Sequence, residues 1–302
     1  MNIKQQAEIY IKRITERKRN PAKPATLAAY ESYLRNWILP RIGQLEVSEV
    51  ENGVMRQLVG QIAKEGKSAS MIAGVEQTLK AVVASAIDMN GNELYPRKWN
   101  PEFIDAPVID PKAQKAPILT PQEVTQAISR AETGIRPFLI LLAATGLRVS
   151  EGLALKGTPN SESSYFDRDR QVLVIRKALY RGQEQSTKTA AGVREVDLPP
   201  GLTSIFPQQT HGYMFTNTEG LPLLSNSRLI RDAANRAGIP GFHSLRRFRI
   251  THLDSQGVPR GLVKFWAGHS SNSDITDRYI KASENIEERK KWCAKAGLGF
   301  EF

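Results

Sequence analysis

A proline-rich stretch around residue 110 divides the sequence into two parts with different patterns. The segment DAPVIDPKAQKAP, residues 105–117, holds three prolines and has no helical period. Proline lacks a backbone N–H and biases the preceding residue away from the helix, so such a stretch interrupts regular structure. The 302 residues are also enough for two domains, at about 150 residues each. We therefore expect a domain of residues 1–105, a linker of residues 106–117 and a second domain of residues 118–302.

Apolar residues before the linker recur with the spacing of α-helices. Residues 4–19, 54–65 and 70–89 are candidate helices. Thr26 can cap another helix, which Pro40 should end or kink. One face of that helix holds Leu27, Tyr30, Leu34 and Trp37. The first part is thus predicted to be a small all-α domain.

The second part mixes helices and strands. Thr120 followed by Pro121 and by Glu123 is a typical helix start, and residues 135–145 form a long apolar helix. The runs QVLVIRK (171–177) and VREVDL (193–198) predict two strands, with the polar tip QSTKTAAG between them. The helices expected after the strands are residues 225–237, 244–255 and 259–268, with Ser244 as the cap of the middle one. The fold class predicted for the whole chain is mainly α with a small antiparallel β-sheet.

Composition narrows the classes of function. The net charge is +11, of which residues 1–105 contribute +3 (15 Lys and Arg against 12 Asp and Glu) and residues 106–302 contribute +8 (27 against 19). Such a basic excess favours nucleic acid as a partner. No run approaches the roughly 20 apolar residues that span a bilayer, and the start MNIKQQAEIYIKR lacks the apolar core of a secretory signal. We expect a cytoplasmic protein with no membrane partner.

Cysteine and histidine usage gives no sign of a metal centre. The chain has one cysteine, Cys293, which excludes an internal disulfide and a cysteine-based zinc site. The four histidines show no metal-like pairing such as HxxxH. We therefore expect no metal and no cofactor.

Six polar side chains of the second part are candidates for chemistry. They are Arg148, Lys188, His243, Arg246, His269 and Tyr279. Taken singly, each has an ordinary structural explanation as a solvated charge, a neighbour of a helix cap or a packed ring. Glu151 lies one helical turn after Arg148 and can hold its guanidinium in place.

The combination of these side chains favours one chemistry. Two arginines, two histidines and a lysine can surround a single phosphate, because guanidinium groups bind phosphate oxygens bidentately. Tyr279 lies in the polar run GHSSNSDITDRYIK, ten residues after His269, and a tyrosine hydroxyl can act as a covalent nucleophile. No carboxylate pair for Mg²⁺ stands out in the sequence. The residues therefore favour metal-free phosphoryl transfer that is assisted by preplaced cations.

The segments that contain these residues resemble the motifs of the tyrosine recombinases, the phage integrase family. ATGLRVSEGLAL is similar to the first arginine motif, with Glu151 at the place of its supporting acid, and KTAAGVREVDLP is similar to the hairpin with the family lysine. FHSLRRFRITHL is similar to the HxxR helix, and WAGHSSNSDITDRYIK to the histidine–tyrosine motif, although the family usually separates these two residues by nine positions. The resemblance covers residues 117–282, and the helical part before them is similar in layout.

The resemblance implies a site-specific DNA recombinase, or integrase, and a role for each candidate. Tyr279 would attack a DNA phosphodiester and form a 3′-phosphotyrosyl link without metal or ATP. Arg148 and Arg246 would bind the non-bridging oxygens, and Lys188 would protonate the leaving 5′ oxygen. His243 would accept the tyrosine proton or hydrogen-bond the phosphate, and His269 would hydrogen-bond the phosphate. Glu151 would orient a neighbouring side chain.

The resemblance also implies partners. The core-binding and catalytic domains would close around double-stranded DNA, and a homotetramer would hold paired sites, with room for accessory DNA-bending proteins. A host cell or mobile element of prokaryotic type, with the protein on the nucleoid, fits this role. The DNA contacts expected from the first domain are Arg35, Arg41, Lys67 and Lys80. In the C-terminal tail, Trp292, Phe300 and Phe302 either anchor a neighbouring subunit or pack within their own chain.

The sequence leaves three alternatives open. One is a DNA-binding protein of the same fold without catalysis. Another is a relaxing enzyme of the type IB topoisomerase class, which uses similar chemistry on any supercoiled DNA. A third is an RNA-binding protein, which the aromatic content of 7% and the lack of stacking motifs disfavour.

Overall fold

The structure is a computed structural model that describes residues 1–110, 117–187, 190–206, 212–224, 227–269 and 284–302. The chain falls into two compact units, Met1–Lys115 and Ala116–Phe302. Each unit has its own hydrophobic core. Among the described residues, no helix is long and apolar enough to cross a membrane.

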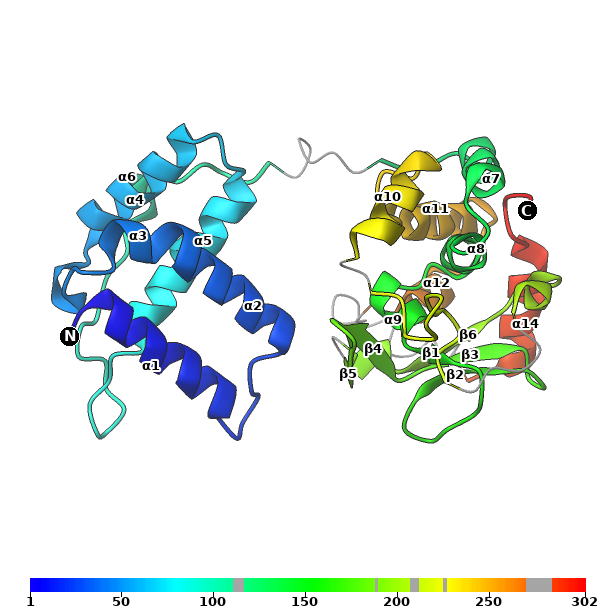
Figure 1. The fold of residues 1–302 in the computed structure, drawn as a ribbon, viewed down its shortest axis with the longest axis horizontal. Coiled ribbons are helices and arrows are strands. Elements are labelled where there is room, and N and C mark those ends of the chain that lie inside the picture. Colours follow the sequence, from blue (N-terminus) through cyan, green and yellow to red (C-terminus); the bar gives the residue numbers. More distant parts are fainter. Residues whose placement is uncertain (111–116, 188–189, 207–211, 225–226, 270–283) are drawn as a thin grey trace. The chain divides into compact units, whose positions relative to one another are not determined.

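Helices form the body of the first unit (Figure 1, blue to cyan). They are α1 (Ile3–Glu16), α2 (Pro24–Tyr33), α3 (Leu39–Ile42), α4 (Asn52–Lys64), α5 (Ala69–Ala84) and α6 (Pro101–Ile104), with a π-helical turn at Leu34–Ile38 and a 3-10 turn at Val47–Glu49. Ile38, Ile62 and Leu79 are fully buried in the core that these helices share. The all-α character predicted for this part is confirmed.

Two helix boundaries in the first unit differ from the prediction. The second helix begins at Pro24 with Lys23 as its N-cap, and not at Thr26, because proline is favoured in the first helical turn. The helix expected at residues 70–89 ends at Ala84. Its continuation is replaced by a turn in which Asp88 Oδ1 accepts hydrogen bonds from the backbone N–H groups of Asn90 (2.8 Å) and Asn92 (2.9 Å).

Pro40 distorts the helix that contains it and does not end it. Proline has no N–H, so the chain forms a π-helical turn in which the N–H of Leu39 bonds to the carbonyl of Leu34. The side chain of Arg41 supplies missing donors, since its Nη1 lies 3.2 Å from the carbonyl oxygen of Trp37 and 3.4 Å from that of Asn36. Arg41 is thus partly a structural residue of this bend.

The second unit is built around one buried helix. Helix α8 (Arg136–Thr145) is buried from Phe138 to Thr145, as the apolar run predicts. Helix α7 (Pro121–Arg130) begins with the predicted capping box, in which Thr120 Oγ1 accepts from the N–H of Glu123 and the Glu123 carboxylate accepts from the N–H of Thr120. A short helix, α9 (Val149–Leu153), follows α8 after the turn at Gly146.

Two small sheets lie beside these helices in the described part of the chain. The larger sheet has the order β1 (Leu155–Lys156), β2 (Ser164–Asp167), β3 (Val172–Ile175) and β6 (Arg194–Asp197), and its β1–β2 pair is parallel. Strands β3 and β6 are the two that the sequence predicts, and they pair antiparallel. Between them the chain forms the hairpin of β4 (Lys177–Tyr180) and β5 (Gln183–Ser186). A 3-10 turn at Ala190–Gly192 precedes β6, and another at Leu202–Ile205 follows it. The predicted fold class is confirmed.

Three helices complete the core of the second unit (Figure 1). They are α10 (Arg228–Arg236), α11 (Phe242–Ser255) and α12 (Arg260–Ala267). Helix α11 begins two residues before the predicted cap, with Gly241 at the N-cap position. The hydroxyl of Ser244 donates to the carbonyl of Gly241 (2.7 Å) and does not cap the helix, so His243 lies inside the first turn and not outside it.

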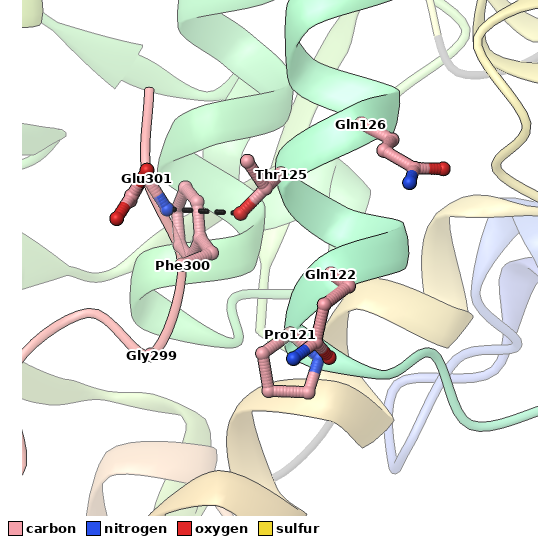
Figure 2. Close-up of a pocket in the computed structure, with 7 residues that line it drawn as sticks. All are labelled: Pro121, Gln122, Thr125, Gln126, Gly299, Phe300 and Glu301. Atoms are coloured by element: carbon pink, nitrogen blue, oxygen red, sulfur yellow. Dashed lines mark hydrogen bonds between the residues drawn. The ribbon is translucent and has the colours of Figure 1, made fainter.

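The C-terminal tail packs against its own chain. Helix α14 (Ile286–Ala296) lies beside β6, and the following segment runs along α11, where Arg249 Nη1 donates to the carbonyl of Gly297 (2.6 Å). Figure 2 shows Phe300 and Glu301 beside α7, with the N–H of Glu301 bonded to Thr125 Oγ1 (3.1 Å). Phe300 belongs to the core and Phe302 is 52% exposed. In this single chain the tail therefore adopts the intramolecular alternative.

The cap of α7 gives a test of the fold. Thr120→Ala removes a side-chain acceptor for the helix N-terminus and should destabilise α7 by about 1 kcal/mol. Hydrogen exchange of the α7 amides, followed by mass spectrometry, should then be about fivefold faster. Ser129→Ala removes a hydroxyl that bonds the carbonyl of Gln126 within the same helix and should change exchange less than twofold. Equal effects of the two variants would contradict the capping box.

Candidate functional site

Arg148 stands at the start of α9, where the chain turns out of the buried helix α8. Gly146 ends α8 with a φ of +68°, a left-handed conformation that glycine adopts without strain. Arg148 is the N-cap residue of α9, and its Nη1 lies 2.7 Å from Glu151 Oε1 while its backbone N–H bonds Glu151 Oε2 (3.0 Å). The sequence-based prediction that Glu151 holds Arg148 agrees with this geometry.

Glu151 is a buried carboxylate between two arginines. Its side chain is 2% exposed, and its second partner is Arg194 of β6, whose Nη2 lies 2.9 Å from Oε2. Burial acts to raise the pKa of Glu151, but the charge and hydrogen bond of Arg194, followed by the charge of Arg148, lower that pKa below its ordinary value. The carboxylate is therefore charged at neutral pH.

Arg246 is buried on α11 and its guanidinium contacts two other segments. Nη1 donates to the carbonyl of Gly146 (2.7 Å), and Nη2 donates to the carbonyl of Ala267 (2.5 Å). Burial, followed by the charge of Arg148, lowers the pKa of Arg246 to about 10. Arg246 thus keeps its positive charge at neutral pH.

His269 is bound directly to Arg246. It follows Gly268, which ends α12 with a φ of +64°, and its Nε2 lies 2.9 Å from Arg246 Nη2. Because arginine can only donate, Nε2 accepts this hydrogen bond and the imidazole is neutral in this arrangement. Arg148 Nη2 also donates to the carbonyl of Gly268 (3.3 Å), so Arg148, Arg246 and His269 meet at the end of α12.

His243 lies one helical turn before Arg246 on α11 and is exposed to solvent. Partial desolvation lowers its pKa below the ordinary value, and the neighbouring charges of Arg247, Arg246 and Arg148 add to this effect. The pKa of His269 is also lowered, by partial desolvation and then by the charges of Arg246 and Arg148. Both rings are therefore neutral at pH 7.

Two of the six candidates, Lys188 and Tyr279, lie outside the described residues. The site that the structure places is thus formed by Arg148, His243, Arg246 and His269 with Glu151 behind them. The site is positively charged, since Arg148 and Arg246 face it and the negative charge of Glu151 is shared with Arg194. Such a cluster attracts an anion with several oxygen acceptors.

The structure shows no alternative use of this cluster as a metal site. Among the described residues, no group of three or more His, Cys, Asp or Glu side chains could hold a metal ion. The side chains around His269 are cationic donors, which repel a metal cation and bind anions.

The four basic residues predicted to contact DNA lie on the first unit in different settings. Arg41 and Lys67 both lie over the ring of Trp37, at 5.2 Å and 5.3 Å from its centroid. Arg41 is also paired with Glu65, and Lys80 with Glu76 (2.6 Å). Arg35 is exposed on the π-helical turn. Lys67 and Arg35 are therefore exposed cations, while Arg41 and Lys80 are partly neutralised.

Arg194 is the residue that sequence reasoning missed. It lies in KTAAGVREVDLP, the segment that contains Lys188, and like Arg148 it binds the carboxylate of Glu151. The available signal was the strand pattern: residues 194, 196 and 198 share one face of the strand predicted at 193–198, and the other two are the apolar Val196 and Leu198. An arginine on an apolar strand face needs a buried acidic partner.

The chain is similar to several known proteins. The chain is 26% identical to a XerC-like tyrosine recombinase of Caldanaerobacter subterraneus subsp. tengcongensis, over 85% of this chain and 74% of that protein. Among solved structures it is similar to the integrase of the transposon Tn1549 in complex with a circular intermediate DNA (TM-score 0.69, 17% identity, 97% and 94% of the two chains). It is also similar to a lambda integrase tetramer bound to a Holliday junction (TM-score 0.65, 17% identity, 91% and 79%). No protein-family model matches the sequence.

The fold is that of the tyrosine recombinases. The resemblance to that family, which the sequence motifs indicate, is confirmed by the likeness to the curated relative and to the solved integrases.

The lowered histidine pKa values give a test of the site geometry. In the DNA-free protein, His243 and His269 should titrate below the ordinary histidine pKa of about 6.5, since protonation would add a charge beside two arginines. Two-dimensional NMR of the imidazole ¹⁵N nuclei, assigned by single substitutions, measures both values. Arg148→Met should bring both pKa values up, because one positive neighbour is lost. Titration at or above pH 6.5 in the wild type would contradict the cluster.

Proposed function

We propose that this protein is a site-specific DNA recombinase that cleaves and rejoins DNA through a 3′-phosphotyrosyl link to Tyr279, without metal or ATP. The observation that supports this most is the convergence of Arg148, Arg246 and His269 at the end of α12. Arg148 lies 98 positions before Arg246 and 121 positions before His269, and the fold brings their polar atoms together around one positive site.

The proposed reaction assigns a balanced step to each group. The hydroxyl oxygen of Tyr279 attacks the phosphorus, and its proton passes to the neutral imidazole of His243. The bond between phosphorus and the 5′ oxygen breaks, and Lys188 protonates the leaving oxygen. The extra negative charge that builds up on the phosphate is stabilised by Arg148 and Arg246.

Neutral histidines fit these roles. A general base must be unprotonated at the working pH, and partial desolvation, followed by the positive neighbours, lowers the pKa of His243 in this sense. His269 accepts from Arg246 at Nε2, which leaves Nδ1–H free to donate to a phosphate oxygen. Reversal of the same step joins the phosphate to another 5′ hydroxyl, so that no energy source is needed.

We further propose that double-stranded DNA is the substrate and that a homotetramer acts on paired sites. The support is the similarity to a lambda integrase tetramer on a Holliday junction, together with the basic net charge. The first unit would act as a core-binding domain through Arg35, Arg41, Lys67 and Lys80. A prokaryotic cell or mobile element, with action on chromosomal DNA, fits the bacterial relative. Accessory DNA-bending proteins are compatible with this scheme.

A covalent-trapping experiment tests the chemistry. The protein is incubated with nicked duplex fragments of the DNA that flanks its own gene, in the presence of a metal chelator, and run on a denaturing gel. We expect a covalent protein–DNA adduct with the wild type and none with Tyr279→Phe, because only the hydroxyl is lost. Tyr180→Phe, at a tyrosine on strand β4, is the matched control and should still form the adduct.

Other outcomes would favour the alternatives. Tight binding without any adduct would indicate a DNA-binding protein that has lost catalysis. An adduct together with relaxation of any supercoiled plasmid would indicate an enzyme of the type IB topoisomerase class. An adduct that Tyr279→Phe still forms would exclude Tyr279 as the nucleophile.

The salt dependence of binding tests the phosphate contacts. DNA affinity, measured by fluorescence anisotropy, should fall at least about tenfold between 50 and 200 mM NaCl, because each neutralised phosphate releases counterions. Lys67→Ala should weaken binding and reduce the slope of log K against log salt by about 1. Lys12→Ala removes an exposed lysine of α1 outside the proposed contacts and should leave the slope unchanged. Equal slopes for the two variants would remove Lys67 from the interface.

A further inference from the structure

Arg194 is a buried arginine of β6 to which the proposed reaction gives no role. Its side chain is 1% exposed, yet its guanidinium makes four polar contacts. Nη2 and Nη1 lie 2.9 and 3.4 Å from the two carboxylate oxygens of Glu151. Nε donates to the carbonyl of Trp266 (2.8 Å), and Nη1 donates to the carbonyl of Gly192 (2.9 Å). One rigid group thus joins three separate segments of the chain.

Each of these segments contains or adjoins a residue of the proposed site. The carboxylate of Glu151 also binds the guanidinium of Arg148. Trp266 lies three residues before His269. Gly192 lies four residues after Lys188. The contacts of Arg194 therefore reach the carboxylate that holds Arg148 and the helix end that precedes His269.

The backbone makes room for this guanidinium. A Cβ atom on Gly268 would lie 2.7 Å from Arg194 Nη1 and 2.8 Å from its Cζ, closer than real Cβ atoms approach. Gly268 also has a left-handed φ of +64°, so both space and conformation require glycine directly before His269. The close approach fixes the end of α12 against Arg194.

We propose that Arg194 is a positioning residue: by holding Glu151 and the end of α12, it sets the orientation of Arg148 and His269 towards the scissile phosphate. This inference rests on the proposed function of the same site. Lysine cannot replace arginine here, because a single ammonium cannot reach Glu151, Trp266 and Gly192 with the geometry of a planar fork. Without the fork, Glu151 keeps only Arg148 as its charged partner and draws it away from the phosphate.

Single-turnover cleavage of the nicked DNA tests this role. In Arg194→Lys we expect the cleavage rate constant to fall about 10- to 100-fold, since misplacement by about 1 Å can reduce a rate a hundredfold. The dissociation constant for the same DNA should change less than threefold. Arg289→Lys is the matched control: Arg289 is also buried and pairs with acids of β6, at 3.0 Å from Asp197 Oδ2 and 2.8 Å from Glu195 Oε2. It should cleave within about threefold of the wild type.

The route through Glu151 is tested in a double variant. If Arg194 acts on Arg148 by way of Glu151, then Arg194→Lys in a Glu151→Gln background should add less than a threefold loss. Full additivity of the two effects would overturn that route. A cleavage rate of Arg194→Lys within twofold of the wild type, or a loss equal to that of Arg289→Lys, would overturn the proposal as a whole.

A titration separates this inference from the proposed function. Arg194→Met removes a positive neighbour and leaves Glu151 only partly balanced, so the pKa of His269 should rise, as ¹⁵N NMR can measure. The Arg289→Lys control should leave it unchanged. If the wild type makes no DNA adduct, the proposed function fails, and this titration still decides whether Arg194 controls the cluster. An unchanged His269 pKa in Arg194→Met would show that it does not.

Discussion

The ion pairs of Glu151 with Arg148 and Arg194 are the interaction on which the site depends. The Glu151 carboxylate is 2% exposed and has lost most of its hydrating water. This desolvation costs on the order of several kcal/mol unless charged partners compensate for it. Arg194 and Arg148 are these partners. The interaction links β6 to the start of α9, and Arg194 extends the link to α12. Removal of either arginine would leave the buried carboxylate only partly compensated, and removal of Glu151 would leave Arg194 buried without a charged partner.

The same arrangement explains how a strongly positive site can exist without an anion. Arg148 and Arg246 repel each other, and the lowered pKa of Arg246 is one sign of this. Backbone carbonyls at helix ends offset the repulsion: Gly146 and Ala267 accept from Arg246, and Gly268 accepts from Arg148. These oxygens hold the guanidinium donors in position. A site that is already oriented needs little rearrangement when negative charge develops, which is the condition for electrostatic catalysis.

Much of this fold could be predicted from the sequence because its signals are local. The capping box at Thr120, the apolar run of α8 and the β-branched runs of β3 and β6 each depend on neighbouring residues, and the structure confirms them. The predicted helix boundaries were wrong where distant residues or competing hydrogen bonds determine the local structure. Ser244 bonds back to Gly241 and does not cap α11, and the Asx turn at Asp88 replaces the end of a predicted helix.

The site shows the same division between local and distant information. The pairing of Arg148 with Glu151 spans three residues and could be predicted from helical spacing. The contact of Glu151 with Arg194 spans 43 residues and depends on how β6 lies against α9, which no local pattern encodes. Arg194 was detectable only as an arginine on an apolar strand face. Such a violation of the strand pattern indicates a buried partner without identifying it.

Helix α11 connects the site to the C-terminal tail. Arg246 and Arg249 are three residues apart, and the first binds the ends of α8 and α12 while the second binds the carbonyl of Gly297. His252, one turn further, bonds the carbonyl of Ala296 through Nε2 (2.8 Å), and a Cβ on Gly299 would lie 2.6 Å from its ring. The Arg249 side chain also packs against Gly146: a Cβ atom on Gly146 would lie 3.3 Å from Cβ and Cγ of Arg249. Because a packed helix moves as a rigid body, the contacts of the tail and the position of Arg246 are set by the same element.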